Sequence, residues 1–370
     1  MEVVGRVIAF LAGATLALWV VSSAIRTVVV PRAEPVKLTR FVFRATRSGF
    51  DLWTKKAGSY QERDRRMARY APVSLLLLPL VWVALVLVGF TGVFWGLGVD
   101  PLRQAFEESG SSLLTLGFVA PKDLPTHVAA FVEAALGLAL VALLISYLPT
   151  IYASFQRREL LVARLATRAS DPPSPVQMIL RHHRLDRLDA LDEIWDEWEV
   201  WFTDIEETHT SQPSLVFFRS ISHERSWVTS AGVVLDAAAL RASTLDLPRN
   251  PRAELCLRAG YLALRRIAGY FGTSYDPDPS PGDPISISRE EFMGAYELLA
   301  AEGVPVRDDA EQCWRDYAGW RVNYDDVVIA LAALTMAPYA AWISDRSRRE
   351  RPTPVRHLRR RPRNGRLDHA

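Results

Sequence analysis

A run of small polar residues between two apolar runs carries the most distinctive chemistry of this chain. Ser109, Ser111 and Ser112 precede the uncharged segment Thr115-Leu116-Gly117-Phe118. Irregular backbone at membrane depth is tolerated only where it is buried in protein or lines a water-filled path. Backbone carbonyl oxygens and a threonine hydroxyl can there replace the water shell of a cation. The stretch therefore predicts a loop that handles ions, provided that the flanking runs cross a membrane.

Three apolar runs are long enough to cross a bilayer, which takes roughly 20 residues at ~1.5 Å each. They occupy 7–30, 71–98 and 124–152. The first is longer than the apolar part of a secretory signal and has no small-residue cleavage site, so we expect a retained span. A fourth run, 327–343, is short, Ala-rich and interrupted by Pro338. It predicts a buried helix of a soluble domain rather than a span.

The distribution of basic residues predicts the orientation of these spans. Arginine and lysine are frequent in the loop 31–70, whereas the loop 99–123 carries only Arg103 and Lys122. Because basic loops remain in the cytoplasm, the N-terminus is expected outside and everything after Tyr152 inside. The chain is therefore expected to be a multi-pass protein of the cell (plasma) membrane with a cytoplasmic C-terminal part.

Composition fits a small membrane part followed by a soluble part, with 49% hydrophobic residues and a mean hydropathy of +0.04 over 370 residues. A net charge of +2 gives no case for nucleic-acid binding. Cys256 and Cys313 match no metal spacing and fit a reducing compartment. No Gly-rich phosphate loop or nucleophile elbow appears, so neither an enzyme nor a cofactor is expected. The candidates for a metal site lack ligand spacing: His182, His183, His209, His223, Glu206 and Glu207.

The order of spans and loop resembles that of the bacterial pore-loop potassium channels over about 71–173. In that family an outer helix, a pore helix, the filter T-V-G-Y-G-D and an inner helix follow one another. Here a short helix is expected at 102–114, and Thr115-Leu116-Gly117-Phe118 match the first four filter positions. Val119 and Ala120 replace the second glycine and the acid. The resemblance implies a cation path lined by Thr115, Leu116, Gly117, Phe118 and Val119, with potassium selectivity left open.

Further roles follow from the same resemblance. Gly137 falls where the inner helix often has a hinge glycine, and Pro149 falls near the kink of the inner gate. Glu107 and Glu108 are expected at the outer vestibule, or else as exposed loop acids. Glu133 is an ionisable group inside a span and is therefore a functional candidate. One pore loop per chain implies a homotetramer, with K⁺ or another monovalent cation as the permeant ion.

The second half of the chain predicts an all-helical cytoplasmic domain, because strand alternation is nearly absent. Helices are expected at 153–169 (continuing the third span), 224–242, 251–271, 288–302 and 324–345, with Ser286 or Ser288 as a cap. Leu188, Leu191, Trp195, Trp198, Phe202 and Ile205 form one apolar stripe. The acidic row Asp186, Asp189, Glu193 and Asp196 is expected to be a solvated face rather than a calcium site.

The fold class is thus an all-α membrane protein with an additional N-terminal span. The expected division is 1–30 (span), 31–70 (basic loop), 71–152 (pore module), 153–175 (helix extension and linker), 176–345 (helical domain) and 346–370 (Arg-rich tail). The tail is expected to be disordered and to contact anionic lipid headgroups. The leading hypothesis is a cation channel gated or assembled by the helical domain. The alternative, which Val119 favours, is a non-conducting scaffold or sensor that retains the pore-loop fold.

Overall fold

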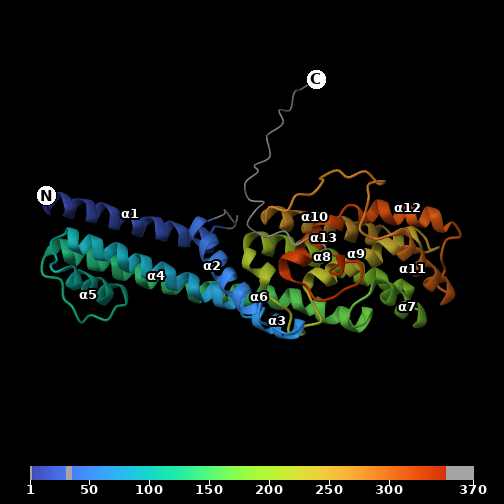
Figure 1. Ribbon diagram of the computed structural model, residues 1–370, viewed down its shortest axis with the longest axis horizontal. Helices are drawn as coiled ribbons and strands as arrows, with labels where there is room; N and C mark the ends of the chain where they lie inside the picture. Colours follow the sequence, from blue (N-terminus) through green and yellow to red (C-terminus); the bar gives the residue numbers. More distant parts are fainter. Residues whose placement is uncertain (1, 31–35, 347–370) are drawn as a thin grey trace, which may run out of the picture. The chain divides into compact units, whose positions relative to one another are not determined.

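The structure is a computed structural model that describes residues 2–30 and 36–346 (Figure 1). Over these residues the regular secondary structure is helical, and β-pairing is limited to one bridge between Leu245 and Val306. The predicted all-α fold class is confirmed. The chain forms two compact units. One runs to Ser154 and includes Ser211–Phe218, and the other comprises Phe155–Thr210 and the residues from Arg219 onward.

Three helices are long and apolar enough to cross a membrane, as the sequence predicts. They are α1 (Glu2–Val28), α4 (Tyr70–Gly96) and α6 (Leu124–Ala169). The 46-residue α6 continues to Ala169, where the predicted extension of the third span ends. The Pro-rich turn that follows cannot continue a helix, and a new one begins after the cap Ser174.

Helices α1 and α4 lie side by side in close contact (Figure 1). A Cβ atom placed on Gly13 would lie 2.2 Å from the carbonyl oxygen of Gly89, and one on Gly96 would lie 2.7 Å from that of Arg6. In lipid, helices associate through such small-residue interfaces, because an apolar surface gains nothing by leaving an apolar solvent. Glycines of both helices therefore set how closely α1 and α4 approach.

The sequence analysis placed no helix in 31–70, and the structure has two there. They are α2 (Lys37–Thr54) and α3 (Tyr60–Met67), whose N-terminus is capped by the Ser59 hydroxyl. Leu38 and Val42 on α2 are buried in the same apolar cluster as α1 and α4. Their four-residue spacing was the available sequence signal for this helix. The short α5 (Leu102–Leu113) matches the predicted helix at 102–114.

The second unit is built around α9 (Trp227–Ser243), which is buried along almost its whole length. Packed against it are α7 (Pro175–Arg184), α10 (Pro251–Tyr270), α12 (Ala310–Arg321) and α13 (Asp325–Thr335). The remaining helices of this half of the chain are α8 (Leu191–Ser211), α11 (Arg289–Ala301) and two 3₁₀ turns, Leu188–Ala190 and Pro213–Phe217 (Figure 1). The predicted helices at 224–242, 251–271 and 288–302 correspond to α9, α10 and α11.

Two details of this unit correct or complete the sequence analysis. The predicted helix 324–345 is wrong beyond Thr335, because Met336 adopts a left-handed conformation (φ 51°) and Pro338 follows. The apolar run is nevertheless buried in part, with Val328, Leu331 and Ile343 inaccessible and Tyr339 exposed. The cap of α11 is Ser288, which forms a reciprocal capping box with Glu291.

A buried ionic network connects α9, α12 and α13. Arg321 donates to Asp236 at 2.6 Å and to Asp325 at 2.7 Å, and a third bond of 2.7 Å reaches the carbonyl oxygen of Trp342. Tyr324 also donates to Asp236, at 2.9 Å. Burial raises the pKa of Asp236, although Arg321 opposes this shift. The single guanidinium therefore fixes two helices and the segment after α13 around one buried carboxylate.

Candidate functional site

The depth of α5 along its neighbours is fixed by one close contact. A Cβ atom on Gly137 would lie 2.1 Å from the carbonyl oxygen of Leu113, the last residue of α5. Gly137 follows Leu124, the first residue of α6, by 13 positions, which is about 20 Å of helix. The C-terminal end of α5 therefore packs well inside the length of α6 rather than at its end.

A second contact, between α5 and α4, also places α5 away from the ends of its neighbours. The Ser109 hydroxyl lies 3.1 Å from the carbonyl oxygen of Leu87, which precedes the last residue of α4, Gly96, by 9 positions. At ~1.5 Å per residue this is roughly 13 Å from the end of that helix. Helix α5 thus lies alongside the interior of both α4 and α6.

The segment after α5 has an unusual backbone. Thr115 has φ 53° and Gly117 has φ 71°, and both values lie in the left-handed region. Glycine adopts this region freely, whereas for threonine it is uncommon and costs energy. Left-handed residues at two alternate positions end α5 and prevent the chain from continuing as a helix.

Ser111 fixes the backbone N–H groups of this segment. Its carbonyl oxygen accepts from the N–H of Leu116 at 2.9 Å and from that of Gly117 at 3.4 Å. Its hydroxyl oxygen accepts from the N–H of Val119 at 3.1 Å. Within the described part of the chain, the carbonyl oxygens of Thr115, Leu116, Gly117 and Phe118 accept no hydrogen bond. The segment thus presents four unpaired carbonyl acceptors, while the N–H groups of Thr115, Leu116 and Gly117 bond back to α5.

The side chains of the segment face away from the rest of the chain. Leu116 is 61% exposed and Phe118 is 64% exposed. Exposed apolar side chains that lie together are typical of surfaces that contact lipid or another molecule. The predicted filter residues Thr115 to Val119 are therefore contiguous and ordered by Ser111, but a single chain does not enclose them.

The two predicted vestibule acids have different environments. Glu107 is partly exposed and pairs with Arg103 at 2.8 Å. Glu108 is buried, and its Oε1 has no hydrogen-bond partner among the described residues. Consecutive helical residues point about 100° apart, so the two carboxylates do not form one acidic surface.

The predicted bending points lie within an uninterrupted helix. Helix α6 continues through both Gly137 and Pro149. Gly137 has a packing role, because it lets α5 approach. Pro149 is exposed and lacks the N–H that would bond to the carbonyl oxygen of Ile145, which weakens the helix locally. The predicted bending roles of both residues stay predictions, and the structure adds a packing contact at Gly137.

Beyond the end of the apolar part of α6, a buried arginine connects it to α8 and α9. Arg158 Nη1 lies 3.1 Å from Nε2 of His209, and the guanidinium stacks near the ring of Trp227. The indole of Trp201 donates to the carbonyl oxygen of Arg158 at 3.1 Å. Sequence reasoning missed this cluster, because Arg158 stands among several basic residues at the end of a span and nothing in its spacing marks it as buried.

The remaining candidates from the sequence are the possible metal ligands, the acidic row and the Arg-rich tail. Within residues 2–30 and 36–346, no group of histidine, cysteine or acidic residues is arranged to hold a metal. In the acidic row, Asp196 pairs with Arg252 at 2.9 Å and Asp189 with Arg187 at 3.4 Å. The Arg-rich tail predicted to contact lipid lies outside the described residues except for Arg346, which pairs with Glu291.

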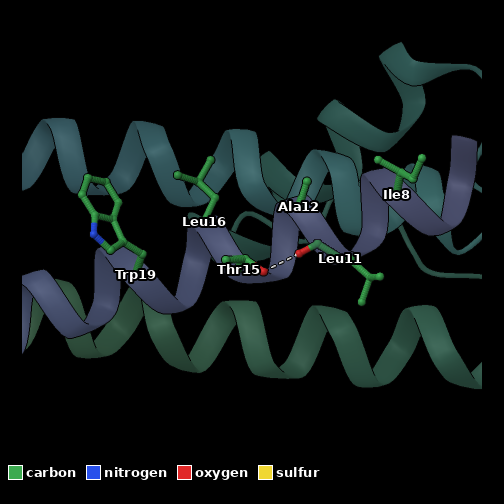
Figure 2. A pocket seen from close by; sticks show the side chains of 6 residues that line it. All are labelled: Ile8, Leu11, Ala12, Thr15, Leu16 and Trp19. Atoms are coloured by element: carbon green, nitrogen blue, oxygen red, sulfur yellow. Dashed lines mark hydrogen bonds between the residues drawn. The ribbon is translucent and has the colours of Figure 1, made fainter.

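A shallow groove follows the outer face of α1 (Figure 2). The Thr15 hydroxyl donates to the carbonyl oxygen of Leu11 at 2.7 Å, so it is not available to a ligand. Besides Thr15, the groove has one lining side chain with a polar atom, the indole of Trp19. Its lining residues are Ile8, Leu11, Ala12, Thr15, Leu16 and Trp19.

Comparison of the chain with protein-family models, curated proteins and solved structures finds no match. The geometry of the site is therefore the basis for assigning a function.

Proposed function

We propose that this chain is one subunit of a homotetrameric cation channel of the potassium-channel type. The observation that carries this proposal is the segment Thr115–Phe118, whose carbonyl oxygens accept no hydrogen bond in the described structure, while the N–H groups of Leu116 and Gly117 bond to the carbonyl oxygen of Ser111. A ring of such carbonyl oxygens replaces the water shell of an ion. The partially negative C-terminal end of α5 points to the same region and favours a positive charge.

The depth of α5 supports a re-entrant loop. If α4 and α6 cross the bilayer, a position about 20 Å along α6 lies within the ~30 Å hydrocarbon core. The chain descends as α5, turns at Thr115 and returns to Leu124 within ten residues. An extended chain covers more than 20 Å in that length, so the return is sterically possible.

The exposed side chains support assembly. Irregular backbone in contact with lipid is not stable, because its polar groups have no partners there. Four copies arranged around an axis would bury Leu116 and Phe118 between them and direct the carbonyl oxygens of each chain to the centre. One loop per chain supplies one quarter of such a ring.

Val119 bears on selectivity. Its N–H donates to the Ser111 hydroxyl at 3.1 Å, and its carbonyl oxygen accepts from the same hydroxyl at 3.4 Å. The Val119 carbonyl is therefore engaged within the chain and does not add an outermost ion site. We expect a shorter filter and weaker discrimination of potassium from sodium. The same observation favours the second candidate, a non-conducting scaffold or sensor.

The helical domain is proposed to lie in the cytoplasm of a multi-pass plasma-membrane protein and to gate or assemble the pore. Helix α6 continues without a break from the candidate span to Ala169. Arg158, 11 residues before the end of α6, is fixed to α8 by hydrogen bonds, and its guanidinium lies near the Trp227 ring of α9. Movement of these helices would therefore act directly on the inner helix.

Cation flux into liposomes containing the purified chain tests the proposal. Potassium and sodium gradients are compared for wild type, Gly117→Ala and Val119→Gly. Alanine at Gly117 meets no neighbour within 4 Å but is strained at φ 71°, so flux is expected to fall without loss of the fold. Val119→Gly is expected to raise the preference for potassium. An intact tetramer without flux in all three proteins would favour the scaffold.

A further inference from the structure

Helix α2 has one face that packs against its own chain and one that does not. On the inner face, Leu38 and Val42 are buried. The carbonyl oxygen of Phe43 accepts from the Tyr70 hydroxyl at 3.2 Å, and the ring of Phe50 meets that of Tyr70 at 5.9 Å. Tyr70 is the first residue of α4, so these contacts fix α2 at the level where the apolar part of that helix begins.

The outer face of α2 is apolar and uncovered. Phe41 is 68% exposed and Leu52 is 63% exposed. Ala45 lies on the same face, because 41, 45 and 52 are separated by helical intervals of four and seven. Trp53 adjoins it and is also exposed. A surface of this kind is not stable in water but fits the boundary between headgroups and acyl chains.

Basic side chains without a carboxylate partner in the described structure lie beside this apolar face and at the end of α2. Two arginines of the region have carboxylate partners, since Arg47 pairs with Asp51 and Arg66 with Glu62. Within the described residues, no carboxylate pairs with five other basic side chains: Lys37, Arg40, Arg44, Lys55 and Lys56. Positive charge beside an exposed apolar stripe is complementary to a layer of anionic headgroups above acyl chains.

We propose that α2 lies at the membrane surface and binds anionic phospholipid headgroups through these cations while Phe41 and Leu52 enter the acyl region. Its chain position fits this placement, because α2 begins nine residues after α1 ends and turns out of the direction of α1 (Figure 1). The inference needs only that α1 and α4 cross the membrane. It is independent of conduction, and it concerns a different segment from the Arg-rich tail.

A probe attached to a single cysteine tests the placement in the full-length protein. The native thiols of Cys256 and Cys313 are buried, and burial raises the pKa of both, so a cysteine reagent labels an exposed new site preferentially. Leu52→Cys on α2 is compared with Leu298→Cys, an exposed leucine on α11 of the helical domain. Both proteins carry the same fluorophore and are reconstituted in phosphatidylcholine with a minority of phosphatidylglycerol.

Quenching by nitroxide-labelled lipid is the readout. The probe at position 52 is expected to be quenched, and more strongly by labelled phosphatidylglycerol than by labelled phosphatidylcholine. The probe at position 298 is expected to respond to neither. A cation near the surface enriches anionic lipid by up to about fivefold. The preference for phosphatidylglycerol should therefore fall several-fold when Arg44→Gln and Lys55→Gln are added, and it should persist with the control Arg258→Gln on α10.

Three results would overturn the proposal. A mobile probe at position 52 that, like the one at 298, is quenched by neither lipid would place α2 in water. Equal quenching by the two lipids would remove the headgroup preference. A probe that is immobile in detergent and in both lipid mixtures, and is quenched by neither lipid, would place a second copy of the chain over this face.

Discussion

Ser109 on α5 and Glu133 on α6 are both buried, and their side-chain oxygens lie 2.5 Å apart. The Ser109 hydroxyl also lies 3.1 Å from the carbonyl oxygen of Leu87 on α4. One hydroxyl therefore connects the three helices that surround the candidate pore loop. It has a single proton to donate and two acceptors beside it, so the arrangement depends on both partners.

Removal of this hydroxyl should loosen α5. Ser109→Ala leaves a buried carboxyl without its partner, and such a loss costs about 1–3 kcal/mol. The midpoint of thermal unfolding in detergent is expected to fall accordingly. Glu133→Leu in the same background removes the unpaired group, so the double variant should recover part of the loss. If the loss of stability in the double variant equals the sum of the losses in the two single variants, the two residues do not interact.

Gly137 is expected to tolerate no side chain. Alanine favours a helix by roughly 0.5–1 kcal/mol over glycine, but at Gly137 its Cβ would lie 2.1 Å from the Leu113 carbonyl oxygen. Overpacking of this kind costs about 1–3 kcal/mol. Gly137→Ala should therefore lower the unfolding temperature, whereas Gly5→Ala, with nothing within 4 Å, should not. Equal stability of wild type and Gly137→Ala would mean that α5 is not seated on α6.

The helices around the candidate pore loop could be predicted from the sequence, because their signals are local. Apolar length gave α4 and α6, and the polar run between them gave α5 to within one residue. The contact of Leu113 with Gly137 could not be predicted, since it joins segments that only folding brings together. The pattern marked Gly137 as a bend, and the structure shows a point of close packing.

The same limit explains the errors in the second unit. The apolar run 327–343 has no local helix terminator before Pro338, so the sequence predicts a helix that continues past Thr335. In the structure the left-handed Met336 ends α13 two residues before Pro338, and Arg321 binds the carbonyl oxygen of Trp342 in the segment that follows. The burial of this arginine and its partners are not visible in the sequence, so the path of the segment after the helix could not be predicted.

Loss of that arginine should be severe. Arg321→Leu leaves Asp236 and Asp325 as buried carboxylates without a cation, a change that costs about 3–5 kcal/mol. The helical domain is expected to unfold at a much lower temperature, as measured by circular dichroism. Arg289→Leu is the control, because its partner Glu311 is exposed and the loss of a surface pair changes stability little. Similar effects of the two substitutions would contradict the buried network.

His209 should make the stability of the helical domain sensitive to acid. Burial, assisted by the charge of Arg158, lowers the pKa of His209 well below its usual value of 6.5. The folded chain keeps the ring neutral, whereas the unfolded chain takes up a proton below pH ~6.5. The free energy of unfolding therefore decreases as pH falls below that value, by up to about 1.4 kcal/mol per pH unit until the lowered pKa is reached.

Two histidine variants isolate this effect. His209→Gln retains an acceptor for Arg158 but cannot titrate, so its unfolding temperature should vary less between pH 6.5 and pH 5.5. His223→Gln replaces an exposed histidine and should retain the wild-type pH dependence. If His209→Gln and wild type lose stability in parallel, the ring is not held neutral by its surroundings.

Two neighbouring serines on α5 allow the loss of a hydrogen bond to the loop to be distinguished from the mere replacement of a serine by alanine. Ser111→Ala removes the acceptor for the Val119 N–H, and no interaction of the Ser112 hydroxyl is present in the described structure. Because one hydrogen bond contributes about 0.5–1.5 kcal/mol, Ser111→Ala should lower cation flux by up to about tenfold. Ser112→Ala should leave it unchanged. Equal flux in both variants, with the tetramer intact, would mean that conduction does not require the ordered backbone from Thr115 to Val119. The proposed role of the carbonyl oxygens of this segment would then be wrong.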